Sequence, residues 1–468
     1  MNTYTKTEKN LYLVGLVGQN IIYAVISSLF AYYIQFTLLI PAYAVGFILT
    51  SARIFDAFKD LFIGSFISKK HLKSGRMKPY LIYLPIPTAI VTVICFLNRL
   101  YNSSSAITQF RNFSVIAFVF IVYLLWEIIF AFGDISIAGF PTLLTESEED
   151  KNALLALRPI GTIAASITAL IAQPLAFSIG ARLGSEQKGF IAIAAILSLI
   201  GGLLFQLTAI RAKERVGVTA ETKQSSFSYF IKNEILRKVF ISGMLGSAKG
   251  TTAIVITPLI SYYYASKDPL KTFLYTFLLG MGSFLGMIIS MTLVPKLKKK
   301  YSSRKIFIYS NFINAAPNSI IFILYLLNRN SMAQFFPLAI LILMMTISGS
   351  CNCISNTVQT MLLSEAVDLE KKKSGNRPEA LFFSCNTFII KVASGVSSFV
   401  VSIGYNIINF SSSQTEMLNE LISSGVAVKD LAAYSPLMTV LFFMLTIPVA
   451  VSSILCIIPF LKKQVYKF

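Results

Sequence analysis

Apolar residues fill long stretches of this chain, and short polar or basic segments separate them. Twelve of these stretches reach about 20 residues, the length that an α-helix needs to cross the hydrocarbon layer of a bilayer. Their centres lie near Ile26, Ala57, Ala89, Tyr123, Ile167, Ala195, Ala253, Leu285, Ile313, Met345, Ser394 and Phe443. The pattern predicts an all-α membrane protein with 12 transmembrane helices.

Composition and charge support this prediction. Of the 468 residues 55% are hydrophobic and 13% are charged, and the mean hydropathy is +0.69. The net charge of +20 could indicate a nucleic-acid partner, but the predicted inner segments hold 28 lysines and arginines and the outer loops only 8. Such a bias predicts cytoplasmic N- and C-termini in the cell membrane. The basic surplus then faces anionic lipid heads, and we expect no nucleic-acid binding.

A weak internal repeat divides the chain into two halves. The longest polar stretch, residues 211–237, separates an N-terminal unit (1–210) from a C-terminal unit (238–468). Basic loops occupy matching places in the two units, at 69–78 and 296–305. This order is typical of two six-helix bundles related by a pseudo-twofold axis, the major facilitator fold, in which the substrate binds between the bundles.

Four charges interrupt the second apolar stretch: Arg53, Asp56, Lys59 and Asp60. On a helix, Asp60 lies about 20° and Asp56 about 60° from Arg53, with Lys59 on the flank of the same face. A charge at the centre of a bilayer costs about 2.5–17 kcal/mol, so these side chains should face a cavity or one another. They indicate an ion or substrate pathway; the alternative is a self-neutralised ion cluster that only joins two helices.

Five further charges fall inside predicted spans: Glu127, Asp134, Arg158, Lys249 and Lys391. Glu127 and Asp134 are seven residues apart and therefore share a helix face. Mutual pairing could neutralise most of the intramembrane charge, but we expect functional roles for Asp134, Lys249 and Lys391. Glu127 could equally support a helix contact or face the outer vestibule.

Enzyme chemistry is disfavoured by the residues available. His71 is the only histidine, which argues against histidine acid–base catalysis and a histidine-ligated metal. No GxxxxGK[ST] phosphate loop is present, which argues against an ATP-driven pump. We expect a protein that is not an enzyme and has no cofactor.

Several motifs, taken together, resemble the glycoside–pentoside–hexuronide:cation symporter family. They occur in both halves and in the family's order, at 53–60, 75–79, 133–142, 158–159 and 361–391. The resemblance implies a secondary active transporter that moves a sugar or glycoside by alternating access, coupled to H⁺ or Na⁺. It implies a cation site at Asp56 and Asp60, sugar contacts at Asp134 and Arg158, and a lysine near both at Lys391.

Departures from the family pattern, at Lys59 and Asn20 among other positions, change the expected substrate. Lys59 replaces a small polar residue, and its ammonium could occupy the cation's place, so that Asp56 and Asp60 would bind Na⁺ only if Lys59 were displaced. Asn20 replaces a sugar-binding aspartate, and Lys249 adds a positive charge. We therefore expect Asn20 and Lys249 among the substrate contacts and an anionic sugar such as a hexuronide.

Three further residues belong to the expected site in a supporting role. We expect Arg53, Glu127 and Thr387 to support the site. The partners should be a small sugar and the lipid bilayer, with the chain acting as a monomer. The alternatives are a uniporter, a carrier of another solute such as a lysophospholipid, and a non-transporting sensor. A lysophospholipid carrier would need an apolar cleft that is open to the bilayer.

Overall fold

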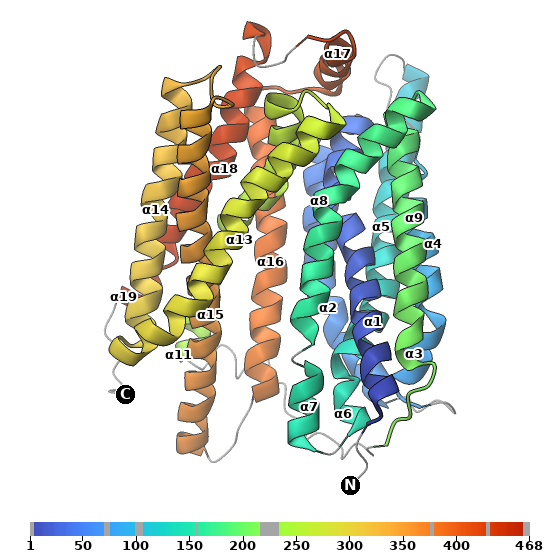
Figure 1. Cartoon of the computed structure of the whole chain (residues 1–468), viewed down its shortest axis with the longest axis vertical. Coiled ribbons are helices and arrows are strands. Elements are labelled where there is room, and N and C mark those ends of the chain that lie inside the picture. The colour runs from blue at the N-terminus through green and yellow to red at the C-terminus, as the bar shows by residue number, and fades with distance from the viewer. Residues whose placement is uncertain are drawn as a thin grey trace.

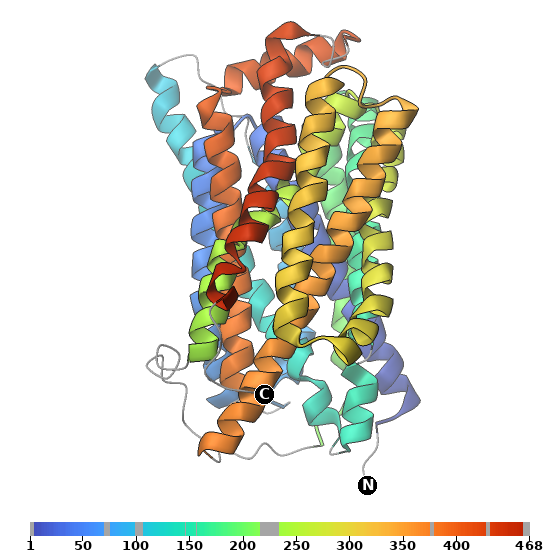
Figure 2. The same cartoon turned by 90° about the vertical axis from the view of Figure 1, so that its left-hand side faces the viewer.

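The computed structural model describes residues 4–69, 75–98, 106–145, 147–155, 157–215, 234–374, 379–426 and 431–461. These residues form an all-helical molecule in which helices α1 to α9 and helices α11 to α19 make two groups side by side (Figure 1). Both ends of the chain lie at one end of the molecule, and α17 lies at the other (Figures 1 and 2). Half of the basic loop at 69–78 and most of the central segment at 211–237 fall outside the described residues.

The helices of the first group run close to the long axis of the molecule (Figure 1). They are α1 (Lys6–Val25) with η1 (Ile26–Phe30) and η2 (Tyr33–Thr37), α2 (Ala42–Lys69), α3 (Lys78–Tyr83), α4 (Pro85–Phe96), α5 (Ala106–Gly139), α6 (Pro141–Leu144), α7 (Glu148–Leu155), α8 (Arg158–Leu183), and α9 (Glu186–Gln206) with η3 (Leu207–Ala209).

The second group has the same general arrangement, with α17 crossing its end (Figure 2). It comprises α11 (Glu234–Leu245), η4 (Ser247–Gly250), α12 (Thr251–Leu259), η5 (Ile260–Tyr264), α13 (Pro269–Lys300), α14 (Ser303–Leu327), α15 (Phe335–Ser374), α16 (Glu379–Ile407), α17 (Ser412–Ser423), η7 (Ala432–Tyr434), α18 (Ser435–Leu455) and α19 (Ile458–Leu461).

The length and apolar character of the helices make this a multi-pass membrane protein. Within the described residues, 9 helices are long and apolar enough to cross a bilayer, and a bent pair, Arg237–Leu245 with Ser247–Tyr264, adds a tenth. Large apolar side chains on the outside, such as Leu327 and Phe335, are 78% and 79% exposed, as expected of surfaces that face lipid.

Both groups begin with a helix that ends in the same unusual way at the α17 end. The first span passes through η1 and η2, two π-helical turns, and is followed by Leu39 with a φ of 63°. The span formed by α11 and α12 passes through the π-helical η5, and Ser266 and Lys267 follow with φ of 47° and 58°. π-Helical turns often mark functional positions. Here they re-aim the ends of two helices in matching places.

Helices α2 and α16, one from each group, are held together by a close backbone approach at Gly395. A Cβ added there would lie 3.2 Å from Arg53 Cβ and 3.3 Å from the Thr50 carbonyl oxygen. Thr50 Oγ1 also donates a hydrogen bond of 3.0 Å to the Gly395 carbonyl. Near the other end of the contact, Ser402 Oγ donates to the Ala42 carbonyl at 2.6 Å. This packing brings Lys391, one turn before Gly395, against the charged face of α2.

Candidate functional site

The charged side chains of α2 gather on one side of the helix, as their spacing predicts. Lys59 forms an ion pair with Asp56, one turn earlier, and its Nζ lies 3.6 Å from Asp60 Oδ1. Asp56 is only 5% and Lys59 only 6% exposed. Because charged groups this deep in a membrane protein need partners or water, this face of α2 belongs to the interior and not to the lipid surface.

Helix α5 adds a third carboxylate to this face. Glu127 Oε1 lies 3.6 Å from Arg53 Nη1, and Glu127 Oε2 accepts a hydrogen bond of 3.4 Å from Lys59 Nζ. Glu127 is 3% exposed. The sequence left open whether Glu127 supports a helix contact or faces a vestibule, and in the structure it links α5 to α2.

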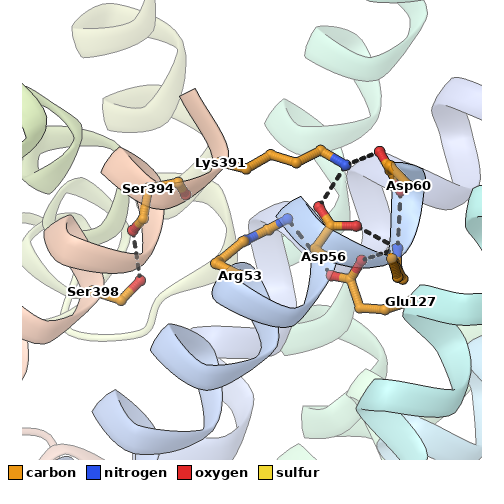
Figure 3. Close-up of polar contacts among 8 residues, drawn as sticks. Arg53, Asp56, Asp60, Glu127, Lys391, Ser394 and Ser398 are labelled. Atoms are coloured by element: carbon orange, nitrogen blue, oxygen red, sulfur yellow. Dashed lines mark hydrogen bonds and ion pairs between the residues drawn. The ribbon is translucent and has the colours of Figure 1, made fainter. Parts of the chain in front are cut away.

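Helix α16 contributes the last cation from the opposite group. Lys391 Nζ lies 2.9 Å from Asp56 Oδ2 and also pairs with Asp60. Figure 3 shows the lysine reaching over from α16 to both carboxylates, while Arg53 points toward Glu127. The side chains of Lys391 and Asp60 keep 21% and 24% exposure, so this edge of the cluster is open to a cavity.

We call this set of six side chains the ion cluster: Arg53, Asp56, Lys59, Asp60, Glu127 and Lys391. Its three cations balance its three carboxylates when all are ionised. Breaking a buried ion pair on one side leaves an uncompensated charge and costs about 3–5 kcal/mol. The cluster therefore joins α2, α5 and α16, the helix-joining role considered from the sequence, but it also forms the wall of a cavity.

That cavity has a volume of about 430 Å³ and is lined by residues from both helix groups. Ten of the eleven side chains expected at the site line it: Asn20, Arg53, Asp56, Lys59, Asp60, Glu127, Asp134, Arg158, Thr387 and Lys391. The volume lies within the range of about 300–1,000 Å³ that is usual for small-molecule sites. The eleventh residue, Lys249, lines a neighbouring cavity.

Asp134 is held by an amide that sequence reasoning did not single out. Gln19 Nε2 donates a hydrogen bond of 2.8 Å to Asp134 Oδ1, and Asn20 Nδ2 donates to Gln19 Oε1 at 2.7 Å. This row of amide and carboxylate groups presents donors and acceptors on the cavity wall, suited to hydroxyl groups. Gln19 sits directly before Asn20 within an apolar part of α1, residues 11–25, a signal that could have identified it.

The neighbouring cavity has a volume of about 640 Å³ and shares four lining residues with the first, Tyr23, Arg53, Ile390 and Ser394. Lys249 lines it from η4, at the break where the bent pair turns by 48°. The ammonium of Lys249 donates to Asn311 Oδ1, and Asn311 Nδ2 donates to Ser355 Oγ at 2.9 Å. A buried polar network of α14 and α15 thus holds a cation at the edge of this second cavity.

Three aromatic side chains also line the first cavity and were missed in the sequence: Tyr23, Trp126 and Phe130. Trp126, the only tryptophan of the chain, lines it beside Glu127. Its ring stacks on Phe130 with centroids 4.8 Å apart, and its Nε1 donates to Thr92 Oγ1 at 2.8 Å. A lone tryptophan beside a glutamate within an apolar span was the available signal.

The two helix groups meet above the cavities, toward the α17 end. Lys267, after η5, forms an ion pair with Glu186 at the start of α9, and its Nζ lies 5.5 Å from the centroid of the Tyr262 ring. Gln173 Nε2 donates a hydrogen bond of 2.8 Å to Ser261 Oγ. We call these five residues the outer seal, because they connect the groups at the end away from the chain termini.

Comparison with known proteins places this arrangement in a family. The model of the family described as "MFS/sugar transport protein" matches residues 11–450. The chain is 25% identical to the "Uncharacterized symporter YjmB" of Bacillus subtilis, covering 82% of this chain and 79% of that protein. It is 24% identical to the "Isoprimeverose transporter" of Lactiplantibacillus pentosus, covering 85% and 79% of the two chains.

A solved structure shows the same fold. The nucleoside transporter NupG superposes with a TM-score of 0.56 over 94% of this chain and 99% of its own, at 15% identity. At that identity the likeness concerns the fold alone. The match of the family model along almost the whole sequence shows that the chain belongs to the MFS/sugar transport protein family.

Proposed function

We propose that this protein is a secondary active transporter that moves a sugar or glycoside across the cell membrane by alternating access, coupled to H⁺ or Na⁺. The observation that carries the proposal is the pair of cavities between the two helix groups, lined by charged and amide side chains from both. A site at the interface of two bundles can be opened to either side when one bundle rocks against the other. The named relatives, a symporter and an isoprimeverose transporter, support this class of activity.

The topology that we propose has 12 spans in two bundles, 1–210 and 238–468, joined by a cytoplasmic segment at 211–237, with both termini cytoplasmic. To the 9 apolar helices and the bent pair it adds two segments, α2 and the α3–α4 pair. Helix α2 carries the charged face of the site. Helix α4 begins at Pro85 and is only 12 residues long, so it needs α3 to complete a span. The position of both chain ends at one end of the molecule fits an even number of spans (Figure 1).

For the substrate we propose contacts from Asn20, Asp134, Arg158, Lys249 and Lys391. A carboxylate can accept hydrogen bonds from two neighbouring hydroxyls, and amides both donate and accept, which suits a sugar ring. The broken helix at Lys249 supports its part, because irregular backbone at membrane depth is tolerated where it lines a cavity. Outside the balanced ion cluster, the two cations Arg158 and Lys249 exceed the one carboxylate, Asp134, by a single positive charge, which favours an anionic sugar such as a hexuronide.

For coupling we propose Asp56, Lys59 and Asp60, with Arg53, Glu127 and Thr387 in support. Lys391 belongs to both sets because it pairs with Asp56 and Asp60 from the opposite helix group. A change in the charge of these carboxylates would change the strength of this link between the groups. Binding at the cluster and binding in the cavity are then coupled, and the coupling acts equally in both directions.

The test is counterflow of labelled sugars in proteoliposomes, which requires transport but no ion gradient. Unlabelled glucuronides and galacturonides should compete with a labelled glucuronide, and neutral galactosides should compete weakly. Exchange of neutral galactosides with indifference to both uronides would refute the anionic substrate. Absence of exchange for every sugar, with sugar binding retained, would refute transport and favour a sensor.

A further inference from the structure

The ammonium of Lys59 lies where three carboxylates of the ion cluster converge. It pairs with Asp56, lies 3.6 Å from Asp60 Oδ1, and lies 3.4 Å from Glu127 Oε2. The side chains of Lys59, Asp56 and Glu127 are 6%, 7% and 4% exposed. An ammonium is a compact point charge. It therefore fills the space and supplies the charge that a bound metal cation would supply there.

We propose that Lys59 is a built-in cation, so that this chain binds no Na⁺ or Li⁺ at the ion cluster while Lys59 is in place. The inference deepens the proposed function, because it concerns what energises transport. It also answers the question that the sequence left open, whether Asp56 and Asp60 hold a free metal ion.

The charge balance of the cluster supports the proposal. Arg53, Lys59 and Lys391 neutralise Asp56, Asp60 and Glu127, so a further cation would leave a buried net positive charge, which is unfavourable away from water. Within the described part of the chain, no group of three or more acidic, histidine or cysteine side chains has the arrangement of a metal site. The carboxylates are arranged around the lysine.

Removing the ammonium should reverse this balance. In Lys59→Asn, three carboxylates would face Arg53 and Lys391, leaving one uncompensated negative charge in a space that an ammonium had filled. Carboxylate and amide oxygens suit small hard cations. The substitution should therefore create Na⁺ binding that the natural sequence lacks.

The experiment measures Na⁺ binding to the purified full-length protein without any sugar. The unfolding temperature and the fluorescence of Trp126, the only tryptophan, beside Glu127, are followed as Na⁺ replaces choline at constant ionic strength, which separates binding from screening. The natural protein should not respond to Na⁺ or Li⁺. Lys59→Asn should show an unfolding temperature that rises with Na⁺ concentration and a saturable fluorescence change.

Two controls keep the result specific. Lys59→Arg preserves the charge and should stay insensitive to Na⁺. Lys188→Asn removes the same charge from α9, outside the cluster, and should also stay insensitive. A saturable Na⁺ response in the natural protein would overturn the proposal, and so would a folded Lys59→Asn protein that does not respond. Loss of sugar exchange under all conditions would instead refute the proposed transport and leave the Na⁺ result unaffected.

Discussion

The outer seal gives a quantitative prediction about how the two helix groups separate. Lys267→Met removes the ion pair with Glu186 but keeps most of the length of the side chain. Glu186 and Lys267 are 25% and 11% exposed, and Glu186 Oε1 also accepts a hydrogen bond of 2.6 Å from Thr37 Oγ1. Fully exposed pairs contribute about 0–1 kcal/mol and broken buried pairs cost about 3–5 kcal/mol. With solvent screening, we expect this pair to stabilise the closed outer end by about 1–2 kcal/mol.

That free energy corresponds to a change of about 5- to 30-fold in a two-state equilibrium. The assay introduces Ser27→Cys, because Ser27 lines the 640 Å³ cavity, and measures its labelling by an impermeant maleimide added to the α17 side of oriented vesicles. Lys267→Met should accelerate labelling by a factor in this range, because opening and closing that are fast relative to labelling make the rate follow the fraction of open protein. Glu186→Gln should act similarly, and the double variant should add little, because both changes remove one interaction.

Lys271→Met is the matched control. Lys271 lies four residues after Lys267, in the first turn of α13, and is exposed. This substitution should leave the labelling rate of Ser27→Cys unchanged. If the Ser27→Cys protein were labelled at the same rate with and without Lys267→Met, the view that this ion pair holds the outer end closed would be contradicted.

Three further substitutions test the site. Gly395→Val should lower the unfolding temperature and slow sugar exchange, because the Cβ of the new side chain would lie 3.2 Å from Arg53 Cβ. An unchanged unfolding temperature and exchange rate would contradict the close packing of α2 and α16. Asp134→Asn should weaken the binding of competing unlabelled sugars by about 10- to 100-fold, because hydrogen bonds to charged groups contribute about 1.5–3 kcal/mol. An unchanged competition curve would show that Asp134 does not contact the sugar. Lys249→Met should reduce exchange of glucuronides more than that of neutral sugars, and equal losses for both would refute its role in charge recognition.

Local patterns in the sequence predicted much of the helical architecture and of the charged face. The spacing of Arg53, Asp56 and Asp60 sufficed to place them on one side of α2, because helical periodicity relates residues three to seven positions apart. Helix α8 begins at Arg158, directly before a proline, which agrees with the preference for proline in the first turn of a helix. These features depend on neighbours in the chain.

Features that depend on contacts between distant segments could not be derived in that way. Lys391 and Asp60 are 331 positions apart, and only the family resemblance brought them together. The pairing of Lys267 with Glu186 depends on how the two groups meet. The π-helical turns in the first span leave the apolar pattern almost unchanged, because each adds only a slight shift of register, so periodicity did not predict them.

The measurement that tests the central claim most directly is net uptake of labelled sugars into proteoliposomes containing the full chain. Each sugar is tested with an inward Na⁺ gradient, with an inward proton gradient, and with neither. The account predicts uptake of an anionic sugar above equilibrium with the proton gradient and no gain from Na⁺, because Lys59 fills the cation position. Uptake that is driven by the Na⁺ gradient, or the absence of uptake for every sugar tested, would contradict it.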